Sequence, residues 1–199
     1  MTTTFLLVRH AAHDNVGGFL AGRKPGVRLG PEGLAQAERL GARMRRERFS
    51  AVIASPRERT QETAAAIARA SGLAEVETDA RLDEIDFGAW SGKTFDQLNL
   101  DEAWARWNAE RATALTPAGE GIADVARRVT ECLTQARGRF KDATVVLVSH
   151  ADVIKTAVCL GLGLGPEHGR LMEISPASIT VLIQGDWGQK LWQLNETIH

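Results

Sequence analysis

The chain has 199 residues, of which 44% are hydrophobic and 25% charged, and its formal net charge is -1. This composition predicts one globular domain with enough apolar material for a core. The near-neutral charge gives no reason to expect a nucleic acid or an anionic membrane as partner. An anion site would therefore have to come from local clustering of cationic side chains.

The N-terminal residues and the cysteines indicate a compartment. No basic segment followed by a small-residue cleavage site is present, so no signal peptide is expected. The most apolar tract, residues 145–165, contains charged residues and many glycines, and is interpreted as core rather than a membrane span. Cys132 and Cys159 lack metal-ligand spacing and are expected to be buried thiols. These features favour a cytoplasmic protein.

Apolar runs and helical periodicities alternate along the chain. Strands are expected at residues 5–8, 51–54, from 76, 144–148, 172–174, 179–183 and 191–194. Helices are expected at 31–48, from 55 to 72, 95–107 (as one helix or two short ones), 122–140 and 152–162. Loops are expected at 14–26 and 113–121. The alternation predicts a three-layer α/β/α fold with a mainly parallel sheet and an antiparallel edge strand.

Two of the expected strands lead into a histidine. The run 5–8 is followed by Arg9 and His10, and the run 144–148 leads to His150. In open α/β sheets, ligands bind beyond the carboxyl ends of the strands. We therefore expect the two histidines to share one pocket.

A third cation follows another short strand. Ser55 and Pro56 form a common N-cap and first-turn pair, so the next helix is expected to begin there with Arg59 in its first turn. Arginine donors match phosphate oxygens, and a neutral imidazole can act as a nucleophile at pH 7. These groups predict a site for phosphoryl transfer. Asp83 and Glu84 are the candidates for its proton donor.

Five segments in order resemble the signatures of the histidine phosphatase superfamily, also called phosphoglycerate mutase-like. They are Leu7-Val8-Arg9-His10-Ala11, Leu29-x-x-x-Gly33-x-x-Gln36-Ala37, Ser55-Pro56-x-x-Arg59-x-x-x-Thr63-Ala64, Leu82-x-Glu84-x-x-Phe87-Gly88-x-Trp90-x-Gly92 and Val148-Ser149-His150-Ala151. The chain most resembles the branch of small phosphatases similar to α-ribazole phosphatase. The resemblance implies a single domain over residues 1–199 with a phosphoglycerate mutase-like fold and a small lid at about 85–121.

The resemblance also implies roles for individual residues. His10 would be the nucleophile that becomes phosphohistidine, while Arg9, Arg59 and His150 would clamp the phosphoryl oxygens. Glu84 would protonate the leaving alkoxide and then deprotonate the attacking water. No metal or other cofactor is implied, because the arginines would supply the positive charge.

Several positions depart from the family pattern. Ala11 and Ala151 stand where glycine is common, which would cost roughly 1–2 kcal/mol if the backbone there were left-handed. His13 replaces a common Thr or Ser, and Asn15 lies one residue before the usual asparagine. His13, Asn15, Arg23 and Ala151 are further candidates for substrate contacts. Specificity is expected to come from the loop after His13 and from the lid.

The leading interpretation is a phosphatase that hydrolyses a small phosphorylated metabolite, a phosphomonoester, through phosphohistidine on His10. The alternatives are a cofactor-dependent phosphoglycerate-type mutase, a phosphoprotein phosphatase, and a non-catalytic member that binds phosphorylated ligands. The stretch from Glu84 to His150 is short for a mutase, which must keep its intermediate under extensive cover. Nothing in the sequence predicts an oligomeric state or a particular substrate. His199 is expected to be exposed and to have no role.

Overall fold

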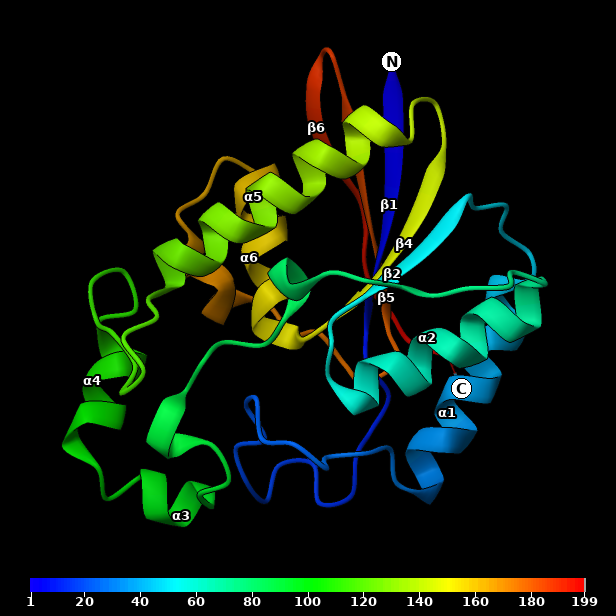
Figure 1. Ribbon diagram of the computed structural model, residues 1–199. Helices are drawn as coiled ribbons and strands as arrows, with labels where there is room; N and C mark the ends of the chain where they lie inside the picture. Colours follow the sequence, from blue (N-terminus) through cyan, green and yellow to red (C-terminus); the bar gives the residue numbers. More distant parts are fainter. Residues whose placement is uncertain (199) are drawn as a thin grey trace.

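A six-stranded sheet with the order β3-β2-β4-β1-β5-β6 forms the centre of the protein (Figure 1). The computed structural model describes residues 1–198, so His199 lies outside the described residues. The strands are β1 (Thr2–Arg9), β2 (Ala51–Ala54), β3 (Glu77–Thr78), β4 (Thr144–Ser149), β5 (Ile179–Gly185) and β6 (Gly188–Glu196).

The sheet is mainly parallel, as the sequence predicts. β1, β4, β2 and β3 pair in parallel, whereas β5 pairs antiparallel with both β1 and β6. The antiparallel edge therefore consists of a hairpin rather than of one strand. Because β1 and β4 are parallel neighbours, their carboxyl ends open on the same side of the sheet.

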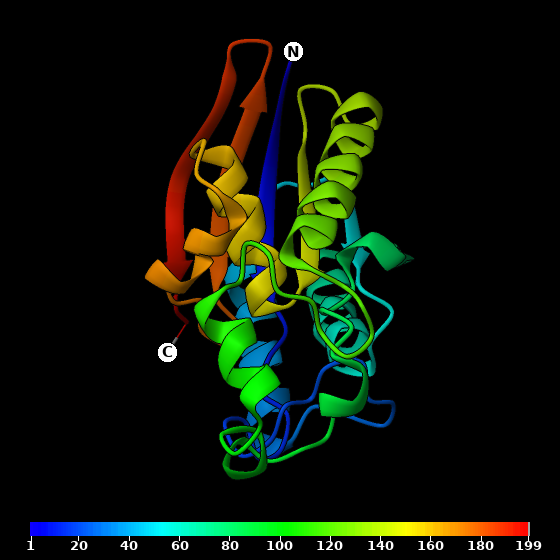
Figure 2. The same ribbon diagram turned by 90° about the vertical axis from the view of Figure 1, so that its left-hand side faces the viewer.

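Four long helices cover the two faces of the sheet (Figures 1 and 2). They are α1 (Pro31–Met44), α2 (Glu58–Ser71), α5 (Ile122–Arg139) and α6 (Ala151–Gly161). Successive side chains of a strand point to opposite faces. Accordingly, Leu6 and Val8 pack with the core under α1 and α2, whereas Phe5 and Leu7 pack with the core under α5 and α6. This confirms the predicted three layers.

Two sequence predictions about elements are wrong. Helix α2 begins at Glu58 with Arg57 as its N-cap, so Ser55 does not cap it. The Ser55 hydroxyl forms hydrogen bonds with side chains from distant parts of the chain instead of capping the helix. Residues 172–174 form no strand and follow a 3₁₀ helix, η3 (Pro166–Leu171). There the carbonyl of Ile174 accepts a hydrogen bond from Arg9 Nη1 at 2.6 Å instead of joining a sheet.

The segment between residues 85 and 121 lies at the carboxyl ends of the strands (Figure 1). It contains η2 (Gly88–Trp90), α3 (Phe95–Leu98) and α4 (Glu102–Ala109), so the expected helix at 95–107 is two short ones. Edge-to-face contacts join the buried rings of Phe87, Trp90, Trp104 and Trp107. The main chain of Leu20 exchanges hydrogen bonds with this segment, which ties it to the loop after β1. A lid function for the segment remains a prediction.

Two further observations concern the cysteines and the helices. Cys132 and Cys159 are buried free thiols, as the sequence predicts. Within residues 1–198, every helix is too short or too polar to cross a membrane.

Candidate active site

The two strand-end histidines lie side by side. Arg9 at the end of β1 is in register with Ser149 at the end of β4, so His10 and His150 leave the sheet together. Their ring centroids are 5.2 Å apart, with the rings edge to face. Both side chains are buried. The structure thus brings together the two imidazoles that the sequence expects in one pocket.

The hydrogen bonds of His10 define which ring nitrogen is free. Nδ1 lies 2.8 Å from the carbonyl oxygen of Ala11, which can only accept, so we infer that Nδ1 carries the proton. Nε2 then accepts a hydrogen bond from Arg59 Nε at 3.2 Å. Burial, followed by the charges of Arg59 and Arg9, lowers the pKa of His10 well below its ordinary value. The ring is therefore neutral at pH 7, with a lone pair on Nε2.

Arg59 links both histidines and is itself fully buried. Its Nη2 donates to the carbonyl of Gly22 at 2.8 Å and to Nδ1 of His150 at 3.2 Å. Its Nη1, like Nε of Arg9, is buried without a hydrogen-bond partner. Buried donors without partners are costly. Two arginines from different elements thus keep cationic donors available for an anion.

Glu84 lies beside His150, near the ring nitrogen that Arg59 also contacts. Its Oε1 accepts a hydrogen bond from the Ile85 N–H at 3.0 Å, and its Oε2 is 3.7 Å from Nδ1 of His150. Burial and, secondarily, the charge of Asp152 raise the pKa of Glu84 to about 7. The carboxyl group therefore changes protonation near neutral pH, which suits a group that must both donate and accept a proton.

The main chain of Glu84 is held by two guanidinium groups. Its carbonyl accepts from Arg23 Nε at 2.7 Å and from Arg128 Nη2 at 3.2 Å. Glu120 is ion-paired with both arginines, and Arg23 also contacts Asp86. The sequence predicts Arg23 as a substrate contact at the pocket mouth. In the structure its guanidinium lies against the acidic segment, and substrate contact remains a prediction.

A second set of polar contacts was not predicted from the sequence. The Ser55 hydroxyl oxygen lies 2.8 Å from Nε2 of His150 and 3.2 Å from Oδ1 of Asp83. Asp83 is also ion-paired with Arg57 at 3.0 Å, and it accepts the Glu84 N–H at 2.8 Å. The sequence predicts for Asp83 only a role as alternative proton donor. Its contacts with Ser55 connect segments far apart in sequence, and no local pattern signals them.

Comparison with known proteins decides the family. A model of the histidine phosphatase superfamily (branch 1) matches residues 5–197. The chain belongs to this family. It is 32% identical to phosphoserine phosphatase 1 of Hydrogenobacter thermophilus over 98% of this chain and 92% of that protein.

Solved structures agree with the family. A mycobacterial glucosyl-3-phosphoglycerate phosphatase is similar with a TM-score of 0.89 and 25% identity, over 99% of this chain and 100% of that one. An α-ribazole phosphatase of Shigella flexneri shares the fold, with a TM-score of 0.87 and 23% identity over 97% of this chain and 96% of that one. The phosphoglycerate mutase-like fold expected from the sequence motifs is thereby confirmed.

The two alanines that stand where the family commonly has glycine are not strained. Neither Ala11 nor Ala151 has a positive φ, so neither incurs a left-handed penalty. Ala151 is the first residue of α6. His13 is buried and stacks beside His10 at a centroid distance of 6.2 Å, whereas Asn15 is exposed in the loop. Substrate contacts by His13, Asn15 and Ala151 remain predictions.

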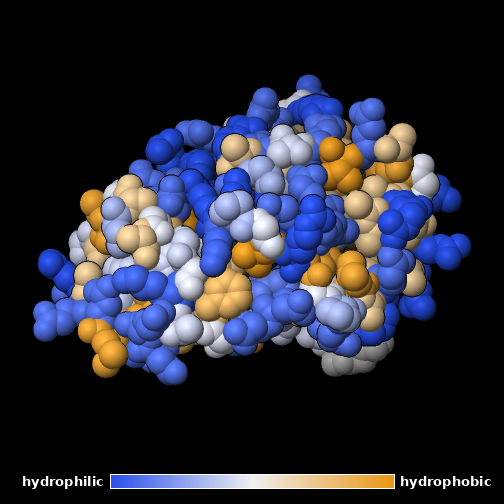
Figure 3. Space-filling model, turned by 60° about the horizontal axis from the view of Figure 1, so that its bottom comes forward, coloured by the Kyte–Doolittle hydropathy of each residue, from blue (hydrophilic) through white to orange (hydrophobic). Residues whose placement is uncertain are grey.

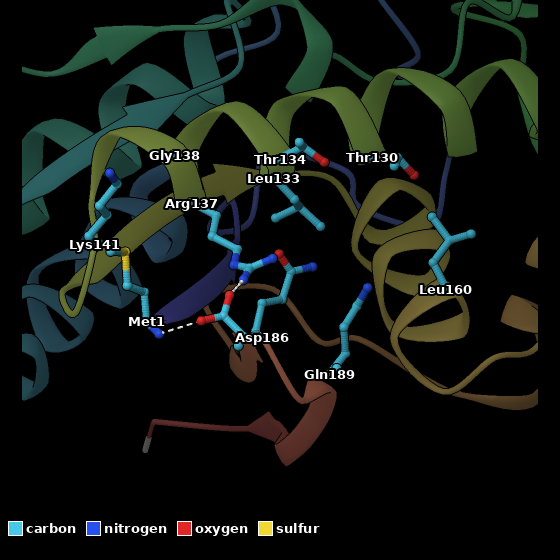
Figure 4. Close-up of a pocket in the computed structure, with 13 residues that line it drawn as sticks. Met1, Thr130, Leu133, Thr134, Arg137, Gly138, Lys141, Leu160, Asp186 and Gln189 are labelled. Atoms are coloured by element: carbon cyan, nitrogen blue, oxygen red, sulfur yellow. Dashed lines mark hydrogen bonds and ion pairs between the residues drawn. The ribbon is translucent and has the colours of Figure 1, made fainter.

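The surface around the candidate site is polar. Figure 3 shows that the face at the carboxyl ends of the strands is mostly hydrophilic, with separate hydrophobic areas. A different cavity, of about 360 Å³, lies beside α5 and the β5–β6 turn (Figure 4). There Asp186 binds the N-terminal amine at 2.7 Å and also Arg137. None of the predicted site residues lines this cavity.

Proposed function

We propose that this histidine phosphatase hydrolyses a small phosphomonoester and that the phosphoryl group passes through Nε2 of His10. The observation that carries the proposal is the set of hydrogen bonds of His10, from which its protonation state is inferred. Its proton is held on Nδ1 by Ala11, its ring is neutral, and its Nε2 lone pair faces the Arg59 guanidinium. A neutral nitrogen beside a cation that can bind phosphoryl oxygens is suited to attack on phosphorus.

The first step forms one bond and breaks another. Nε2 of His10 attacks phosphorus as the ester P–O bond breaks, and protonated Glu84 gives its proton to the leaving oxygen. Arg9, Arg59 and His150 take the phosphoryl oxygens, because cationic and N–H donors stabilise the charge that gathers there. No metal is required for this charge stabilisation, so metal-independent turnover is part of the proposal.

The second step returns the protein to its starting state. Glu84 is now a carboxylate and takes a proton from water, whose oxygen attacks phosphorus as the N–P bond breaks. Inorganic phosphate leaves, His10 is neutral again, and Glu84 is protonated again. A pKa of about 7 allows one carboxyl group to serve in both steps.

The names of the relatives suggest substrates to test first. Similar proteins are called phosphoserine phosphatase and glucosyl-3-phosphoglycerate phosphatase, which are small-molecule phosphatases. We therefore propose a small phosphorylated metabolite as substrate rather than a phosphoprotein. The two free thiols, Cys132 and Cys159, support a reducing, cytoplasmic compartment.

A screen of phosphorylated metabolites with purified protein tests this proposal. Free phosphate is measured for phosphoserine, 3-phosphoglycerate, α-ribazole phosphate, a phosphopeptide and an aryl phosphate, with His10→Ala as the matched control. The proposal predicts release from at least one metabolite by the wild type only. Isomerisation of a phosphoglycerate without phosphate release would indicate a mutase. Preference for the phosphopeptide would indicate a phosphoprotein phosphatase, and binding without turnover a non-catalytic member.

A further inference from the structure

The contacts of His150 indicate which of its ring nitrogens carries the proton. The Ser55 hydroxyl has one hydrogen and lies within hydrogen-bond distance of both Asp83 Oδ1 and His150 Nε2. The Asp83 carboxylate can only accept, so the hydroxyl donates to it and accepts from Nε2–H. The same tautomer leaves a lone pair on Nδ1, which accepts the hydrogen bond from Arg59 Nη2. The opposite tautomer would set two donors against each other at Nδ1.

A bound phosphoryl dianion would remove the partner of that lone pair. Arg59 now directs two donors at imidazole nitrogens, at 3.2 Å from each. To bind phosphoryl oxygens and free His10 for attack, Arg59 must turn these donors towards the anion. Nδ1 of His150 would then face an anionic oxygen with a lone pair of its own, which is repulsive. A proton on Nδ1 turns this repulsion into a charge-assisted hydrogen bond.

We propose that binding of a tetrahedral dianion protonates His150 at Nδ1, and that Ser55 and Asp83 are positioning residues which stabilise the resulting imidazolium. The added proton comes from solvent and forms one N–H bond. The Nε2–H of the cation keeps its hydrogen bond to the Ser55 hydroxyl. That hydroxyl in turn donates its own hydrogen bond to the Asp83 carboxylate. The proposal rests on the phosphate site of the proposed function and extends it to a protonation step coupled to binding.

The charged groups around His150 are consistent with this coupling. In the ligand-free protein, burial and then Arg59 lower the pKa of His150 well below its ordinary value. The titratable and charged groups that face it are Arg9, His10, Arg59, Asp83, Glu84 and Arg128. A dianion offsets the cations among them, so protonation becomes favourable only when the site is occupied. Asp83 itself stays anchored by Arg57.

Sulfate is the probe for the test, because it stays a dianion through the neutral range and brings no proton. The experiment uses Glu84→Gln, in which the neighbouring carboxyl group cannot titrate. Sulfate binding is measured by calorimetry at pH 8 in buffers of different ionisation enthalpy, which gives the proton uptake. We expect about one proton per bound sulfate, and an affinity that falls about tenfold per pH unit between the pKa of His150 in the free protein and its higher pKa in the complex.

Side-chain ¹⁵N spectra of the histidines show where the proton resides. His150→Asn identifies the His150 signals by their loss. Before sulfate is added, we expect Nδ1 of His150 to carry no proton. At saturating sulfate, we expect both of its ring nitrogens to be protonated. Binding of sulfate with a neutral His150, or with the proton on His10, would overturn the inference and leave the phosphate site intact. No binding at all would overturn the phosphate site as well.

Variants of the positioning residues separate this role from a purely structural one. In Ser55→Ala and Asp83→Asn, each made in the Glu84→Gln background, the imidazolium loses its partner. The pKa of sulfate-bound His150 should therefore fall, so that less than one proton is taken up per bound sulfate at pH 8. Asp86→Asn, made in the same background, alters a carboxylate that contacts neither Ser55 nor His150, and it should keep the pH dependence and proton uptake of its parent. Proton uptake equal to that of the parent in Ser55→Ala and Asp83→Asn, with affinity lowered equally at every pH, would contradict the coupling.

Discussion

Nε of Arg59 lies 3.2 Å from Nε2 of His10, so the guanidinium donates to the nitrogen that we propose attacks phosphorus. This hydrogen bond belongs to the resting protein, since a nitrogen that accepts it cannot attack at the same time. Substrate binding must exchange it for a contact between Arg59 and a phosphoryl oxygen. Arg59 thereby both holds the nucleophile in place and binds the group to be transferred.

Replacing Arg59 by lysine should be severely damaging although the charge is kept. A lysine ammonium is a compact charge and cannot reproduce the planar fork that reaches His10, His150 and Gly22 together. We expect kcat to fall about 10²–10³-fold, the usual effect of removing one preorganised donor. Arg69→Lys, an exposed position on the same helix, is the matched control in steady-state assays. Equal kcat in the two variants would exclude this role for Arg59.

Glu84→Gln should harm poor leaving groups far more than good ones. An alkoxide needs a proton as its P–O bond breaks, whereas a nitrophenolate leaves without one. We expect the ratio of aryl to alkyl phosphate turnover to rise by about 10²–10⁴-fold, the usual contribution of general acid catalysis. Because the pKa of Glu84 is about 7, the wild-type rate for alkyl phosphates should fall as the pH rises above neutrality.

Asp86→Asn is the control for that measurement. Asp86 is partly exposed and pairs with Arg23 outside the histidine cluster, so its loss should not alter the leaving-group dependence. Asp83→Asn is unsuitable as a control, because Asp83 bonds both Ser55 and the main chain of Glu84. A leaving-group effect in Asp86→Asn but not in Glu84→Gln would show that Glu84 is not the proton donor.

The raised pKa of Glu84 also predicts a pH-dependent stability. The folded protein binds this proton more tightly than the unfolded chain, because the pKa rises from 4.5 to about 7. Stability from this group is therefore full below pH 4.5 and is lost as the pH rises through 7. Glutamine stays neutral, so Glu84→Gln should be more stabilising at pH 8 than at pH 5, by about 2–3 kcal/mol. Urea unfolding of both proteins at the two pH values measures this difference, and a difference of zero would contradict it.

Turnover should persist in excess EDTA. Arg9 and Arg59 provide buried cationic donors in the place where other phosphoryl-transfer enzymes use magnesium. An aryl phosphate assay with and without the chelator measures this directly. Loss of activity that a divalent metal restores would rule out the metal-independent mechanism.

The sequence predicts those parts of the protein that follow from local patterns. The apolar runs that end at Arg9 and Ser149 identify β1 and β4, and parallel pairing then forces His10 and His150 together. This is why the histidine pair and most elements were predictable. The family motifs supplied Arg59 and Glu84 as partners.

The wrong predictions come from contacts between distant segments. A Ser-Pro pair after a strand normally caps a helix, but the Ser55 hydroxyl bonds Asp83 and His150 instead. The stretch ending at Ile174 is apolar enough for a strand, yet the carbonyl of Ile174 accepts a hydrogen bond from Arg9. Arg23 Nε donates to the carbonyl of Glu84, a contact that the sequence does not predict, while its expected substrate contact stays a prediction. Such partners depend on the tertiary fold, which no sequence period encodes.

Trapping the phosphorylated protein tests the central claim most directly. Wild-type protein is quenched during turnover of a substrate labelled in its phosphoryl group, and the retained label is tested for stability and mapped to a residue. The account predicts a label that is lost in acid, survives in alkali, lies on His10 and is absent from His10→Ala. A label stable in acid and lost in base, or one that persists in His10→Ala, would contradict the assignment of His10 as the nucleophile.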